Sequence, residues 1–127
     1  MEFVILVICI LLLEYFVFVM MVGAARHKSG IKAPAMVGDE RLERALRVQM
    51  NTLEQMVIVI PAMWIFAVYI SALWGAALGL VFVVGRAIYA RGYMQEPDKR
   101  GMGFLIGALA TWGLLGGAMF GAVRAVL

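Results

Sequence analysis

The stretch that decides the fold runs from Met56 to Gly85 and reads MVIVIPAMWIFAVYISALWGAALGLVFVVG. It is 30 residues long and carries no charged residue. A helix that crosses a membrane needs roughly 20 apolar residues, so this run is long for one crossing and short for two. Two flanking runs, Phe3–Ala25 with the single charge of Glu14 and the uncharged Gly101–Val123, each have the length of one crossing.

The composition places the chain in a membrane. Of its 127 residues, 65% are hydrophobic and 15% are charged, whereas soluble domains are roughly 45–50% apolar with about a quarter charged. This excludes a disordered chain, a fibrous rod and a conventional soluble enzyme, and the length predicts one domain over residues 1–127. The one cysteine, Cys9, lies in an apolar run and offers neither a disulfide nor metal-ligand spacing.

The positions of the basic residues decide how the central run is read. The net charge is +3, and ten of the eleven Lys and Arg residues fall in the segments Arg26–Arg47 and Arg86–Arg100. Because these segments lie between apolar runs, their charges favour a membrane surface over nucleic acid as the partner. Three crossings would put these segments on opposite sides of the membrane, whereas four crossings put both on the cytoplasmic side, as the positive-inside tendency prefers. We therefore predict an all-α bundle of four membrane-spanning helices. A tight turn is expected at Trp74-Gly75, and Asp39 is expected to cap the second helix. The expected spans are Phe3–Ala25, Arg41–Leu73, Gly75–Tyr93 and Gly101–Arg124.

The second helix must draw on a polar flank to reach spanning length. At 100° per residue, its polar residues Arg44, Arg47, Asn51 and Glu54 fall within about 80° of one another. Such a stripe can grip an anion and a cation on one ligand. Gln49 points about 160° away from Asn51, so one subunit cannot easily aim both at the same ligand.

The third helix carries a second polar strip. Arg86, Tyr89 and Tyr93 fall within about 60° of one another, and Arg100 follows after the break at Glu96-Pro97. Ionisable groups at membrane depth are functional candidates, but interfacial anchors and internal ion pairs use the same residue types. Spacing alone therefore leaves a ligand site and a structural polar network as equal alternatives.

Two features of the apolar runs add expectations. Glu14 lies near the middle of its helix, where a carboxylate either makes a buried interhelical hydrogen bond or serves a function. Glycines repeat every four residues on the last helix and predict close helix packing; they are Gly103 and Gly107, and then Gly113, Gly117 and Gly121.

Two motifs resemble those of one family. Glu43–Glu54 reads ERALRVQMNTLE and meets the pattern E-R-x-x-R-x-x-x-N-x-x-E without a gap. Gly85–Tyr93 reads GRAIYARGY and is followed seven residues later by Arg100. Together they resemble the MAPEG family, membrane-associated proteins in eicosanoid and glutathione metabolism, in its microsomal glutathione transferase branch. The resemblance implies a homotrimer with glutathione, the co-substrate, bound between adjacent subunits and no metal.

The resemblance also implies residue roles. Arg47 would bind a glutathione carboxylate, Asn51 the peptide and Glu54 the γ-glutamyl ammonium, while Arg100 would stabilise the thiolate as the catalytic residue. The resemblance further implies that Tyr89 and Tyr93 line the tripeptide and that Arg26 and Gln49 reach in from the neighbouring subunit. Outside the resemblance, we predict that Arg44 and Arg86 are structural polar residues.

The predicted function is a membrane glutathione transferase, with peroxidase activity as a further expectation. It would conjugate the glutathione thiolate to lipophilic electrophiles, with membrane lipids and further copies of the chain as its other partners and no nucleic acid. The alternative is a non-catalytic family member that binds and presents lipids. Two departures bear on this: Gln55 stands where several leukotriene-synthesising relatives have tyrosine, and Gly101 where the prostaglandin E isomerase branch has serine.

Overall fold

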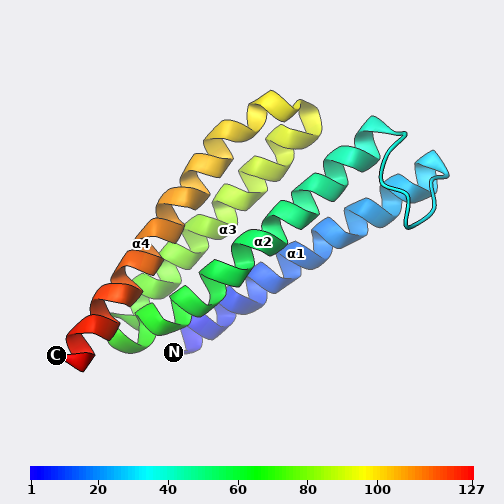
Figure 1. Ribbon diagram of the computed structural model, residues 1–127. Helices are drawn as coiled ribbons and strands as arrows, with labels where there is room; N and C mark the ends of the chain where they lie inside the picture. Colours follow the sequence, from blue (N-terminus) through cyan, green and yellow to red (C-terminus); the bar gives the residue numbers. More distant parts are fainter.

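Four long helices form an up-and-down bundle in the computed structural model, which describes residues 1–127 (Figure 1). They are α1 (Glu2–Ser29), α2 (Glu40–Tyr69), α3 (Ala72–Gln95) and α4 (Gly101–Val126), and the 3-10 helix η1 (Pro97–Arg100) joins α3 to α4. All four are long and apolar enough to cross a membrane. The prediction of an all-α four-helix bundle is therefore confirmed, and the three-crossing alternative is wrong.

The predicted turn between the two central helices is wrong by a few residues. α2 ends at Tyr69, and the chain reverses at Ile70 and Ser71 rather than at Trp74-Gly75. The Ser71 hydroxyl accepts a hydrogen bond from the backbone N–H of Trp74, with an O···N distance of 3.2 Å. A serine at this position caps the free N–H groups of a helix, so α3 begins before Trp74.

The start of α2 is also capped by a side chain, and the predicted cap at Asp39 is confirmed. The Asp39 carboxylate accepts a hydrogen bond of 2.9 Å from the backbone N–H of Leu42. Glu40 and Glu43 lie in the first turn, where negative charge complements the helix dipole. The polar flank of α2 is therefore helical from its first residue, which gives its side chains fixed angular positions.

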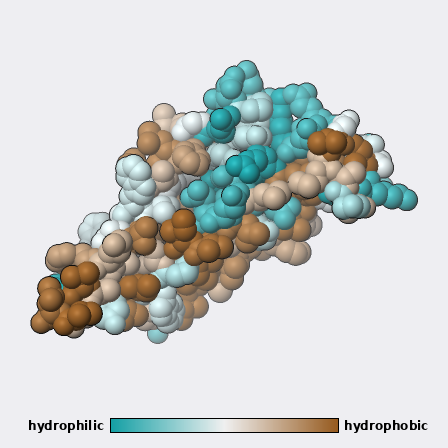
Figure 2. All heavy atoms as spheres, viewed as in Figure 1, coloured by the Kyte–Doolittle hydropathy of each residue, from teal (hydrophilic) through white to brown (hydrophobic).

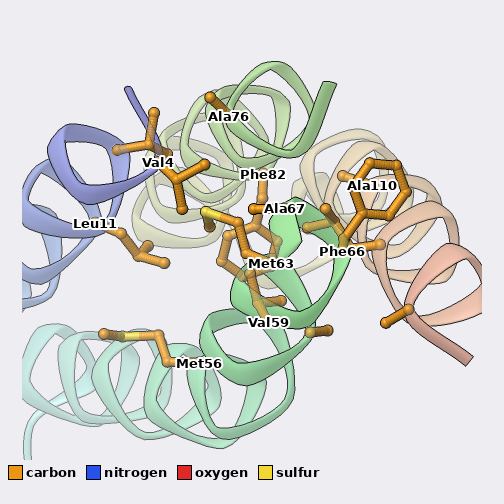
Figure 3. Packing of buried hydrophobic residues seen from close by; sticks show 14 residues of the cluster. Val4, Leu11, Met56, Val59, Met63, Phe66, Ala67, Ala76, Phe82 and Ala110 are labelled. Atoms are coloured by element: carbon orange, nitrogen blue, oxygen red, sulfur yellow. The ribbon is translucent and has the colours of Figure 1, made fainter. Parts of the chain in front are cut away.

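The apolar core lies in the half of the bundle that carries the chain termini. Figure 3 shows side chains of all four helices meeting around Met63 and Phe82 of α2 and α3, both fully buried. Small residues let the helices approach closely: a Cβ atom on Gly85 of α3 would lie 2.8 Å from the backbone nitrogen of Gly107 of α4. Glycine-mediated packing of α4 is thus confirmed.

The outside of the bundle is apolar along much of its length. Large exposed side chains include Leu6, Leu13, Phe16, Trp112, Met119 and Phe120. Figure 2 shows hydrophobic residues at the end with the termini and hydrophilic residues gathered toward the opposite end. An apolar exterior of this kind is suited to lipid chains, and it leaves one polar end where a charged ligand could enter.

Both basic segments lie at that polar end. The connection formed by residues 30–39 and the α3–η1–α4 corner are together at the end opposite both termini (Figure 1). Arg26, Arg47 and Arg86 belong to helices rather than to loops, so the basic segments are mostly helix ends. Their common location is what the four-crossing arrangement requires.

Candidate functional site

A surface cavity of about 330 Å³ lies in the polar half of the bundle. Its six lining residues come from α2, α3, η1 and α4, and they are Arg47, Asn51, Tyr89, Tyr93, Arg100 and Phe104. Five of the six were singled out from sequence spacing. The cavity therefore brings together polar residues of α2, the tyrosines of α3 and Arg100 of η1.

The α2 wall carries a charge pair. Arg47 and Asn51 are one helical turn apart, and Glu54 lies a further turn along the same face. The Arg47 guanidinium donates to the Glu54 carboxylate with an N···O distance of 3.4 Å. The two side chains remain 52% and 62% exposed, so both charges stay accessible to a ligand that could replace this pair.

The α3 wall is aromatic. Tyr89 is buried at 2% exposure, and its ring centroid lies 5.7 Å from that of Tyr93. The Tyr89 ring also lies 6.4 Å from the ring of Phe104 on α4. Three rings therefore form one side of the cavity, and two of them carry phenolic hydroxyls that can donate hydrogen bonds.

Behind this wall, Arg86 points into the bundle. It is only 1% exposed, and its guanidinium carbon lies 4.0 Å from the Tyr89 ring centroid. Its Nη2 donates to Asn51 Oδ1 at 2.8 Å and to Thr52 Oγ1 at 2.9 Å, and its Nε donates to Thr52 at 3.3 Å. Arg86 is thus below the cavity floor and does not line the cavity with Tyr89 and Tyr93.

Arg100 is at the rim. It ends η1, is exposed, and donates from Nη1 to the Pro97 carbonyl at 2.8 Å. Its guanidinium carbon lies 5.9 Å from the Tyr93 ring centroid. No carboxylate pairs with it within the chain, so its positive charge is available to an anion in the cavity.

Arg44 is turned toward the end of α3. Its Nη1 donates to the carbonyls of Met94 at 3.2 Å and Gln95 at 3.0 Å, and its Nη2 pairs with Glu40. Carbonyls in the last turn of a helix have no partner within that helix. Arg44 therefore binds the end of α3 to the start of α2 and does not reach the cavity.

Arg26 and Gln49 are not brought to the cavity within one chain. The Gln49 amide donates to the Tyr15 hydroxyl on α1 at 3.1 Å. Arg26 donates to the carbonyl of Ala35 at 2.7 Å and lies beside residues 30–33, at a separate depression. This separation agrees with the angular argument that Gln49 and Asn51 cannot face one ligand from the same subunit.

The sequence did not indicate a role for two residues of the site, and it left the role of Glu14 open. Phe104 and Thr52 were missed, although Phe104 lies one turn after Arg100 and Thr52 follows Asn51 within the polar flank. Glu14 lies in α1 with its Oε1 buried and without a hydrogen-bond partner. The interhelical hydrogen bond expected for Glu14 is absent from the single chain.

The side chains define what could bind. Two guanidinium groups, one amide and two phenols line the cavity, and the Glu54 carboxylate pairs with the guanidinium of Arg47. Guanidinium groups bind carboxylates, and a carboxylate binds ammonium. The arrangement is suited to a small zwitterion with an excess of negative charge.

Comparisons with known proteins identify the family. The chain matches the MAPEG family over residues 4–120. It is 47% identical over 105 residues to the uncharacterized protein sll1147 of Synechocystis, covering 83% of this chain and 77% of that protein. It is 38% identical over 101 residues to human microsomal glutathione S-transferase 2, with 78% and 69% covered. It is 30% identical over 104 residues to leukotriene C4 synthase of Cavia porcellus, with 82% and 69% covered. Because the family match includes the cavity and most of all four helices, we conclude that the chain belongs to the MAPEG family.

Proposed function

We propose that the chain is a membrane glutathione transferase. In this proposal glutathione occupies the cavity between α2, α3, η1 and α4, its thiol is held as the thiolate beside Arg100, and the sulfur attacks a lipophilic electrophile. The observation that carries the proposal is the cavity itself, which Arg47 and Arg100 line together with Tyr89 and Tyr93. The relatives named glutathione S-transferase and leukotriene C4 synthase support the same chemistry.

The charges of glutathione fit the side chains one by one. The tripeptide has two carboxylates, one ammonium and one thiol. Arg47 binds a carboxylate, Glu54 binds the ammonium, and Asn51 hydrogen-bonds the peptide. In this assignment the ion pair between Arg47 and Glu54, 3.4 Å apart in the free protein, gives way to two pairs with the ligand, so neither charge is left uncompensated.

Arg100 acts by electrostatics rather than by proton transfer. A guanidinium stays charged at neutral pH and cannot serve as a base, but a nearby cation lowers the pKa of a thiol. The thiol proton is released to water, and the thiolate remains beside the guanidinium. Its attack forms a carbon–sulfur bond while the leaving group departs with the bonding electron pair. A fixed cation at the site of the anion needs little reorganisation during the reaction.

The second substrate reaches the cavity from the membrane that surrounds the apolar exterior. A lipophilic electrophile dissolves in the membrane and reaches the sulfur past Phe104, which is 43% exposed at the cavity edge. Holding both reactants together provides much of the rate enhancement. We further propose a homotrimer in which Arg26 and Gln49 of an adjacent subunit complete the binding of glutathione, with the polar end of the bundle on the cytoplasmic side.

Conjugation of glutathione to chlorodinitrobenzene by the purified protein tests the proposal. The unaltered protein should form the conjugate, and Arg100→Ala should lower kcat about 100-fold or more while glutathione still binds. The matched control is Lys99→Ala, which removes an adjacent exposed cation outside the cavity and should retain turnover. A protein that neither conjugates nor binds glutathione would instead be the lipid-presenting kind of family member.

A further inference from the structure

The hydrogen bond between Arg86 and Asn51 fixes which way the Asn51 amide faces. A guanidinium can only donate hydrogen bonds, so the Asn51 atom 2.8 Å from Arg86 Nη2 must be the acceptor Oδ1. The NH2 group of the same amide is therefore directed away from Arg86. It donates to no group of the chain, although Asn51 lines the cavity.

Thr52 holds Arg86 in this position. The Thr52 hydroxyl accepts hydrogen bonds from both Nε and Nη2 of Arg86 and donates its own proton to the Val48 carbonyl at 2.7 Å. Each of its hydrogen-bonding positions is therefore used within α2 and α3. The Tyr89 ring covers Arg86 at 4.0 Å, so the guanidinium has little freedom to rotate.

The buried charge of Arg86 needs an explanation beyond stability. Arg86 is 1% exposed and makes no salt bridge in the chain. The Glu14 carboxylate of α1 attracts the Arg86 guanidinium but forms no salt bridge with it. Burying a charge without a direct ionic partner is costly, and apolar residues of similar size often stabilise a core equally well. Among the cavity residues, Arg86 donates a hydrogen bond to Asn51. We therefore expect the buried cation to orient the Asn51 side chain.

We propose that Arg86 is a positioning residue that holds the Asn51 amide with its NH2 group toward the cavity, so that the site selects a carbonyl oxygen of the ligand. This inference rests on the proposed function, in which the ligand is glutathione and the acceptor is one of its peptide carbonyls. Arg86 does not touch the ligand itself. Its effect is on affinity for glutathione and not on the reactivity of the thiolate, which the proposed function assigns to Arg100.

A double-mutant cycle tests the inference by steady-state kinetics with glutathione as the varied substrate. Arg86→Lys keeps the charge but loses the planar fork that reaches Asn51 and Thr52 together. We expect this variant to raise KM for glutathione about tenfold, with kcat changed less than twofold. In an Asn51→Ala background the same substitution should raise KM no further. Equal effects in both backgrounds, or a loss of kcat alone, would overturn the inference.

A second variant covers the case in which Arg86→Lys fails to fold. Asn51→Asp keeps an oxygen facing Arg86 and replaces the NH2 group by an acceptor, so the protein should stay folded while KM rises at least tenfold. Unchanged KM would contradict the assignment. Arg91→Lys, at an exposed position of α3 away from the cavity, controls for loss of a guanidinium and should retain KM.

The outcomes separate this inference from the function on which it rests. If the unaltered protein shows no glutathione binding by calorimetry, both fail together. If it binds glutathione and Asn51→Asp or the double-mutant cycle gives the contrary result, only the positioning role of Arg86 fails.

Discussion

Gly103 of α4 lies directly against the backbone of Tyr89 of α3. A Cβ atom at position 103 would be 2.2 Å from the Tyr89 nitrogen and 2.6 Å from its Cα. Both atoms belong to the backbone and cannot move aside as a flexible side chain could. This contact sets the distance between the helix that carries the tyrosine wall and the helix that carries Phe104, so a structural glycine also shapes the cavity.

Gly103→Ala should therefore destabilise the protein and disturb the site together. We expect a loss of about 1–3 kcal/mol in the free energy of unfolding, because overpacking forces α4 away from α3, and a raised KM for glutathione. Unfolding by denaturant in detergent and steady-state kinetics measure the two effects. Gly116→Ala is the matched control, since a Cβ there meets nothing within 4 Å. Equal stability of the two variants would contradict the role of Gly103.

Glu54→Gln should weaken glutathione binding without lowering stability. The pair of Glu54 with Arg47 is largely exposed, and exposed ion pairs contribute only about 0–1 kcal/mol. Loss of a carboxylate that binds the ligand ammonium should raise the calorimetric Kd about tenfold while Tm stays within a few degrees. Glu43→Gln removes an exposed and unpaired carboxylate of the same helix and should leave the Kd for glutathione unchanged. A lower Tm with unchanged Kd would mean that the pair is structural.

Arg44→Ala should lower stability through the end of α3. The substitution frees the Met94 and Gln95 carbonyls that Arg44 binds, and hydrogen bonds from a charged donor are worth about 1.5–3 kcal/mol. We expect a lower Tm. We also expect a modest fall in kcat, because η1, which carries Arg100, directly follows the end of α3. Arg41→Ala removes an exposed neighbour with no hydrogen bond in the chain and serves as the control. Unaltered Tm in Arg44→Ala would exclude the capping role.

The four helices and most of the cavity could be predicted because two strong signals agree. Charge placement selects four crossings, and helical periodicity puts Arg47 with Asn51 and Tyr89 with Tyr93. The turn was misplaced because Ser71 lies inside an uncharged run, where hydropathy is flat and only the cap hydroxyl marks the boundary.

Periodicity gives the direction of a side chain around its helix axis but not what it meets there. Arg86 shares an angular strip with Tyr89 and Tyr93, yet it points inward because Asn51 and Thr52 of α2 offer acceptors on that side. Phe104 was missed for a related reason. An apolar residue in an apolar helix carries no signal until the packing of α4 against Tyr89 is known.

The most direct test of the account measures the thiolate itself. On mixing the purified protein with glutathione at neutral pH, the ultraviolet difference absorption of the thiolate should appear in proportion to occupied sites. It should be lost in Arg100→Ala even when glutathione saturates that variant. A thiolate signal of equal size in Arg100→Ala, or none in the unaltered protein with glutathione bound, would contradict the claim that this cavity ionises glutathione beside Arg100.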